Sequence, residues 1–92
     1  MKPIRLSEHA KGRLRQRGAT EGEVLQCIRH SPRSAVRGGR FCARKTFLFD
    51  SISLVNNQRY RFKTIEAILA DAPNEVVVVT VKVYYSNEER DR

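Results

Sequence analysis

The stretch EVVVVTVKVYY, residues 75–85, decides the fold, because it combines six valines with two tyrosines and contains no glycine or proline. β-branched and aromatic side chains favour extended backbone, so we predict a strand here. Alternate side chains of a strand point to opposite faces of its sheet. One face, which can receive helices, comprises Val77, Val79, Val81, Val83 and Tyr85. The other face, which becomes polar toward its end, comprises Val76, Val78, Thr80, Lys82 and Tyr84.

Three further strands are predicted upstream of this stretch. The sequence DAPN, residues 71–74, is typical of a hairpin loop. It favours a strand over residues 59–70, although the Ala, Leu and Glu residues at the end of that segment favour a helix. Gly38-Gly39 predicts a tight turn between a strand from about residue 34 and a strand over residues 40–49. Turn residues interrupt the middle of this region at Asp50-Ser51 and Asn56-Asn57.

The N-terminal third of the chain carries the signals of two helices. Ser7 is a good N-cap, and Gly18 is a good residue to end the helix that follows. Thr20 and Glu23 have the spacing of a capping box, which predicts the start of a second helix. Pro32 disfavours helical backbone at the residue before it, so the second helix ends there.

These elements predict a single α+β domain over residues 1–92. Two N-terminal α-helices, at about 7–31, pack on an antiparallel β-sheet meander of three to five strands, at about 34–85. A charged tail, 86–92, follows. A chain of 92 residues has the length of one small domain, and its core is thin. Such a domain can be a monomer, or a partner or a second copy of the chain can stabilise it in a small homo-oligomer.

Several classes of protein are excluded by composition. The longest aliphatic run is residues 76–79, so no membrane span is expected. The N-terminus MKPIR has no apolar segment typical of a secretory signal, so a cytoplasmic location is expected. Two cysteines are too few for a disulfide scaffold. Cys27 and His30 form only half of a zinc site, so we expect reduced cysteines, no metal and no cofactor.

The charge of the chain is segregated. The net charge is +8, yet residues 1–46 hold 12 Lys and Arg against 3 acidic residues, whereas residues 47–92 hold 6 against 7. Nine of the twelve basic residues are arginines, whose planar guanidinium suits phosphate. The sequence therefore predicts a nucleic-acid partner, with RNA favoured. An acidic protein partner is the alternative.

The two histidines differ in position. His9 lies in the first turn of the first helix, where backbone N–H groups attract anions, and it can act as a general base or acid. Arg13 and Arg17 follow on the same stripe at i+4 and i+8. His30 lies at a helix C-terminus and is expected to make a charge–dipole contact. Carboxylates are scarce in the basic half, which argues against a metal-dependent nuclease.

Five short motifs together resemble a small bacterial family of unknown function. They are SEHAKGR (7–13), QRGATEGEV (16–24), GRF with RKTF (39–41 and 44–47), YRFKTI (60–65) and VVVTV (77–81). The family is grouped by fold with RelE/ParE-like and colicin D-like ribonuclease toxins. The resemblance implies helices on an antiparallel sheet that act on RNA without a metal. The chain departs from the family's pattern at residues 58–60, where related chains have a glycine-rich turn, and at Lys82, where an aromatic residue is common.

A metal-independent endoribonuclease is thus the first hypothesis for function. Cleavage needs a proton acceptor, a proton donor and cations around the phosphate. The predicted catalytic residues are His9, Arg44, Lys63 and Thr80, which form one site if they share a face of the sheet. The predicted nucleic-acid contacts are Arg13, Arg17, Arg40, Lys45, Arg61, Tyr60 and Tyr84. The alternatives are a non-catalytic RNA- or DNA-binding module and a protein-interaction domain of a toxin–antitoxin-like pair.

Overall fold

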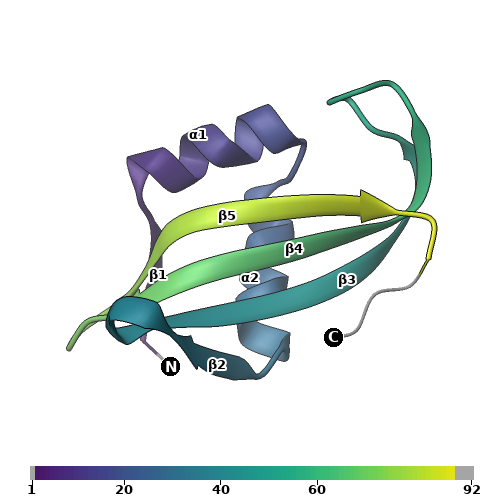
Figure 1. Ribbon diagram of the computed structural model, residues 1–92. Coiled ribbons are helices and arrows are strands. Elements are labelled where there is room, and N and C mark those ends of the chain that lie inside the picture. Colours follow the sequence, from purple (N-terminus) through teal and green to yellow (C-terminus); the bar gives the residue numbers. More distant parts are fainter. Residues whose placement is uncertain (1, 89–92) are drawn as a thin grey trace.

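The computed structural model describes residues 2–88, which form two helices packed on one curled five-stranded sheet (Figure 1). In chain order the elements are β1 (Ile4–Leu6), α1 (Glu8–Arg17), α2 (Glu21–His30), β2 (Arg33–Val36), the 3-10 turn η1 (Arg37–Gly39), β3 (Arg40–Ile52), β4 (Arg59–Asp71) and β5 (Val76–Ser86). The strand order in the sheet is β1-β5-β4-β3-β2. The predicted α+β architecture with two N-terminal helices is confirmed.

The expected meander is antiparallel from β2 to β5, but the sheet also has a parallel strand that we did not predict. β1 pairs with β5 in parallel, with Ile4 opposite Val76 and Leu6 opposite Val78. A three-residue strand carries too little periodicity to be recognised. Two ion pairs hold this end of the chain, Lys2–Asp71 and Arg5–Glu75.

Both helices begin and end as their sequences predict. The Ser7 side chain accepts a hydrogen bond from the backbone N–H of Ala10, and Gly18 ends α1 in the left-handed conformation with φ of 77°. Thr20 and Glu23 form the predicted capping box of α2, and Ser31 before Pro32 is extended. Within residues 2–88, no helix is long and apolar enough to cross a membrane.

One strand boundary differs from the prediction, because the turn residues Asp50-Ser51 do not end the strand. Asp50 lies inside β3, in the left-handed region with φ of 43°, next to a register shift between β3 and β4. The chain reverses later, at residues 53–58, so β3 is longer than predicted. Residues 64–70 are strand, as the hairpin interpretation required. Of the predicted charged tail, Ser86 ends β5, and residues 89–92 lie outside the described residues.

A bulge in β5 changes which valines face the core. Ile68 pairs with Thr80 and Leu69 with Val78, so Val79 is an extra residue without a partner opposite it. Before the bulge, Val76 and Val78 are buried, opposite to the prediction from strict alternation. After it, Val81 and Val83 are buried, as predicted.

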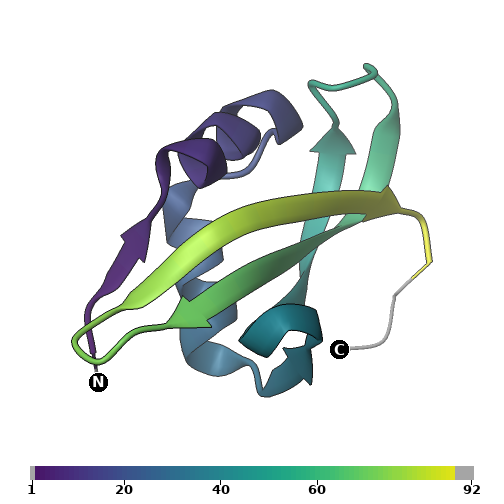
Figure 2. The ribbon, with the colours of Figure 1, turned by 60° about the vertical axis from the view of Figure 1, so that its left-hand side comes forward.

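The core lies between the helices and one face of the sheet (Figures 1 and 2). Ala10 and Leu14 of α1 join it, and from α2 Val24, Cys27 and Ile28 do so. In Figure 2, α1 runs beside the β5 edge of the sheet and α2 crosses behind the strands. The other face of the sheet is left uncovered by helices.

Candidate functional site

Three rows of side chains cross the uncovered face of the sheet, which we call the open face. The rows run from β3 through β4 to β5 and follow from the register of the strands. They are Cys42–Ile68–Thr80, Arg44–Glu66–Lys82 and Thr46–Thr64–Tyr84. Polar and charged groups of three strands therefore lie next to one another on this face.

His9 reaches the open face from α1. Because β1 pairs only with residues 76–78, β5 is the sheet edge beyond the bulge, and α1 runs along it. The His9 imidazole Nε2 lies 3.1 Å from Thr80 Oγ1. When Nε2–H donates to this oxygen, Nδ1 is the basic nitrogen of the neutral ring. The structure thus brings together two residues that are 71 positions apart in the chain.

A cationic groove lies between α1 and β5. Its volume is about 270 Å³, and Arg13, Arg17, Lys82 and Tyr84 line it together with Thr80. We call it the groove cavity. None of its lining residues is acidic. The stripe of His9, Arg13 and Arg17 predicted from helical spacing therefore faces β5, and its arginines supply positive charge beside Thr80.

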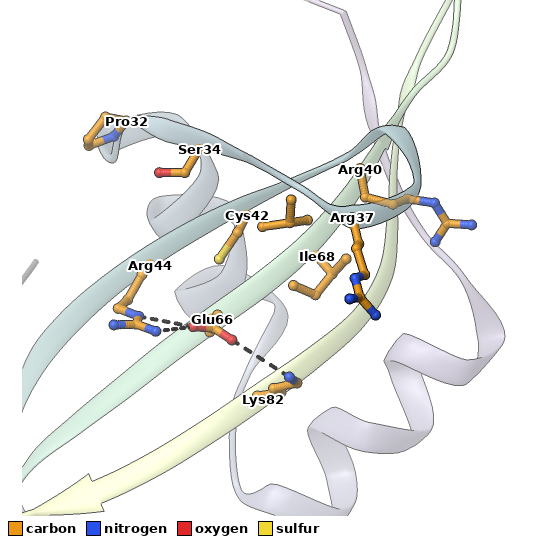
Figure 3. A pocket seen from close by; sticks show the side chains of 10 residues that line it. Pro32, Ser34, Arg37, Arg40, Cys42, Arg44, Glu66, Ile68 and Lys82 are labelled. Atoms are coloured by element: carbon orange, nitrogen blue, oxygen red, sulfur yellow. Dashed lines mark hydrogen bonds and ion pairs between the residues drawn. The ribbon is translucent and has the colours of Figure 1, made fainter.

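Two more cavities adjoin this groove. One, the helix cavity, lies over α1 and is lined by Glu8, His9, Gly12, Arg13 and Gln16. The other, the turn cavity, lies under the β2–β3 turn, and its lining includes Lys82, Arg44, Arg40 and Glu66 (Figure 3). Arg13 lines both the helix and groove cavities, and Lys82 lines both the groove and turn cavities. The three cavities therefore form one chain of adjoining depressions.

Arg44 lies in the middle row, bound to a carboxylate. Its Nε donates to Glu66 Oε2 at 3.0 Å and its Nη2 contacts the same oxygen, while Lys82 Nζ lies 3.9 Å from Oε1 (Figure 3). The hydrogen bond to Glu66 raises the pKa of Arg44. Arg44 is thus paired with Glu66 on the open face, and Glu66 offsets part of its charge.

Lys63 does not join these residues, which corrects the predicted four-residue site. It lies opposite Phe47 and Tyr85, in a row on the helix-covered face. Its Nζ lies 2.8 Å from Glu23 Oε2 and donates to the Gly18 carbonyl at 3.2 Å. Because only 6% of its side chain is exposed, Lys63 is a structural residue that ties the α1–α2 connection to the sheet.

Three predicted nucleic-acid contacts lie apart from the three cavities. Lys45 follows Arg44 on β3 and lies over the Phe47 ring, 5.6 Å from its centroid. Tyr60 stacks on Tyr85, with 5.4 Å between the ring centroids. Arg61 lies over the Phe62 ring at the far end of β4. None of these residues lines any of the three cavities. The other four predicted contacts do line a cavity: Arg40 lines the turn cavity, and the groove cavity is lined by Arg13, Arg17 and Tyr84.

Sequence reasoning did not single out Glu66 and Lys82 as site residues. A signal for Glu66 exists, because it is an acid in an otherwise apolar segment and such a residue needs a partner when buried. The signal for Lys82 is its place in a valine-rich strand. Both cysteines are free, and no group of three or more His, Cys, Asp or Glu side chains suited to a metal occurs in residues 2–88.

No protein-family model, curated protein or solved structure matches this chain.

Proposed function

We propose that this chain binds single-stranded RNA along the open face and α1. The observation that carries the proposal is the chain of three cavities joined through Arg13 and Lys82. A strand of RNA presents phosphates at regular intervals, and a groove with successive cations follows such a backbone. Tyr84, which lines the groove cavity, offers an aromatic ring on which a base stacks.

Cleavage of the bound RNA is a second, narrower proposal, favoured by the contact between His9 and Thr80. In this reaction the imidazole takes the proton of a ribose 2′-hydroxyl, and the 2′-oxygen attacks the adjacent phosphorus. The bond from phosphorus to the 5′-oxygen breaks, and a water molecule protonates the leaving oxygen. The hydroxide so formed takes the proton back from the imidazolium. Arg13 and Arg17 would stabilise the charge that develops on the phosphate.

The binding proposal predicts a specific response to charge removal. Arg13→Ala with Arg17→Ala is expected to weaken binding of a single-stranded RNA by roughly tenfold per arginine, because each substitution removes a charge-assisted hydrogen bond to phosphate. The plot of log affinity against log salt should become less steep, by about 0.7 in slope for each phosphate that the variant no longer neutralises. Fluorescence anisotropy with a labelled oligonucleotide measures both quantities.

A matched control separates the groove from general basicity. Arg15→Ala with Arg29→Ala removes the same charge from two exposed arginines that line none of the three cavities. We expect this control to retain wild-type affinity within about threefold, because salt screens exposed charges that lie far from the phosphates. Equal losses in both double variants would contradict the groove as the binding site. Affinity that neither salt nor either variant changes would favour the acidic protein partner instead.

A further inference from the structure

The turn cavity is the largest of the three depressions, at about 600 Å³. That volume is within the range of about 300–1,000 Å³ that small-molecule sites occupy. The strand β2 and the turn η1 curl over the open face and form its wall (Figure 3). Gly38 and Gly39 make this curl possible, since both adopt left-handed backbone with φ of 72° and 69°. The turn cavity shares only Lys82 with the groove cavity, so RNA bound in the groove leaves the rest of the turn cavity available.

The rim of the turn cavity carries cations that are available to a ligand. Arg37 and Arg40 both line the cavity, and both are exposed. Neither side chain makes a hydrogen bond or an ion pair with residues 2–88. A guanidinium without a carboxylate partner suits a phosphate group. The rim can therefore hold an anionic part of a ligand.

The floor of the cavity combines apolar surface with one carboxylate. Ile68 and Cys42 lie side by side on neighbouring strands and offer a surface for a flat ring (Figure 3). Glu66, which is only 7% exposed, lies on the same floor. Both contacts from Arg44 go to its Oε2, whereas Lys82 Nζ is 3.9 Å from Oε1, beyond hydrogen-bond distance. Burial and the neighbouring Glu66 carboxylate raise the pKa of the Cys42 thiol, which hydrogen-bonds to that carboxylate. Oε1, which Arg44 does not contact, keeps a lone pair that can accept a hydrogen bond from a ligand.

A carboxylate at this place discriminates among nucleobases. The Watson–Crick edge of guanine presents two adjacent donors, N1–H and the N2 amino group, to one carboxylate. Adenine and cytosine present one amino group beside an acceptor nitrogen, and uracil presents one N–H between two carbonyl oxygens. Those extra acceptors repel a group that can only accept. Guanine is the base that fits Glu66 best.

We propose that the turn cavity binds a guanine nucleotide of the RNA strand. The base lies over Ile68 and Cys42 with its Watson–Crick edge toward Glu66, and the phosphate lies near Arg37 and Arg40. This inference rests on the proposed RNA binding, because Lys82 then links the guanine site to the groove where the next phosphates lie. A guanine next to the bound phosphate backbone would give the chain a sequence preference that the groove alone does not provide.

The free nucleotide 5′-GMP tests the inference apart from RNA binding. Isothermal titration should show 5′-GMP binding about tenfold or more tightly than AMP, CMP, UMP or inorganic phosphate, the factor that one extra charge-assisted hydrogen bond to Glu66 Oε1 provides. Binding should also slow alkylation of Cys42 by iodoacetamide, because that thiol lies on the cavity floor. Cys27 is an internal control, since it is fully buried and burial raises its pKa to about 11.

Three variants complete the experiment. Arg37→Ala with Arg40→Ala, both exposed, should lower affinity for all four nucleotides by about tenfold or more, the cost of removing a charge-assisted hydrogen bond to phosphate. Glu66→Gln should remove the preference for GMP, and its fold is checked by circular dichroism. Arg13→Ala with Arg17→Ala should leave GMP binding unchanged, so loss of RNA binding and loss of the guanine site are distinguishable.

The inference is overturned if the four nucleotides bind equally, or if inorganic phosphate competes as well as GMP, because the cavity is then only an anion site. It is overturned equally if GMP neither binds nor protects Cys42 in the wild-type protein. Selective GMP binding in a protein that does not bind RNA would support the guanine site and refute the proposed RNA-binding function.

Discussion

His9→Ala is expected to slow RNA cleavage in EDTA by about 10²–10⁴-fold, the usual contribution of a positioned general base. The imidazole is held against Thr80 at 3.1 Å, beside the arginines of the groove cavity. Alanine removes the imidazole that takes the 2′-hydroxyl proton, whereas the groove cations that bind phosphate remain. Most of the RNA affinity should therefore persist in this variant. A gel assay on a 5′-labelled single-stranded RNA measures the rate.

The second histidine provides the control for this experiment. His30 ends α2 and lines none of the three cavities. His30→Ala should therefore cleave at the wild-type rate. An oligonucleotide with 2′-deoxy residues should resist cleavage, because it lacks the attacking hydroxyl. Equal rates for wild type and His9→Ala would exclude His9 as the base, and no cleavage by the wild type would leave RNA binding as the function.

Lys63→Met is expected to destabilise the fold by about 3 kcal/mol, at the lower end of the cost of breaking a buried ion pair. The substitution keeps the aliphatic stem but leaves Glu23 without its cation. It also removes a donor to the Gly18 carbonyl and the cation over the Phe49 ring, 4.9 Å from its centroid. Glu23 is 24% exposed and keeps some access to water, which limits the loss. Urea unfolding followed by circular dichroism measures the change.

Two companion variants identify the cause of that destabilisation. Glu23→Gln added to Lys63→Met should restore part of the stability, because the unpaired charge is gone and glutamine can keep the capping box. Lys45→Ala, which loses the interaction with Phe47, should cost no more than about 1 kcal/mol. If the Lys63→Met protein kept wild-type stability but no longer cleaved RNA, a structural role would be contradicted and a catalytic role for Lys63 supported.

The connection between α1 and α2 explains why Lys63 is buried. Tyr85 donates a hydrogen bond of 2.7 Å to the Arg17 carbonyl, next to Gly18. A Cβ at Gly18 would lie 2.8 Å from that hydroxyl oxygen, closer than side chains tolerate. The sheet thus approaches the end of α1 closely, and Lys63 fills the same region. Such an approach depends on tertiary packing, so it leaves no periodic signal in the sequence.

Local signals predicted the helices and most strand positions. The caps at Ser7, Thr20 and Gly18 act within a few residues, so they can be read from the chain directly. The stripe of His9 and its two arginines follows from helical spacing and does face β5. Local signals do not predict how the strands pair, because contacts between residues far apart in the chain set that pairing.

The division of the candidate site between two faces shows this limit. Arg44 and Lys63 belong to different strands, and only the register, with Arg44 opposite Glu66 and Phe47 opposite Lys63, places them on opposite faces. A shift of one residue in that register would exchange the faces. In β5, the bulge at Val79 inverts the alternation once, so Val76 and Val81 both face the core. No residue in the valine run marks where that bulge occurs.

The most direct test of the account is to map RNA onto the folded protein. Titration of a ¹⁵N-labelled protein with a short single-stranded RNA should shift amide signals along the cavities, most of all those of Arg13, Thr80, Lys82 and Tyr84. The signal of Lys45, on the helix-covered face, should stay in place. Shifts confined to the helix-covered face, or no shifts at an RNA concentration in the millimolar range, would contradict RNA binding on the open face.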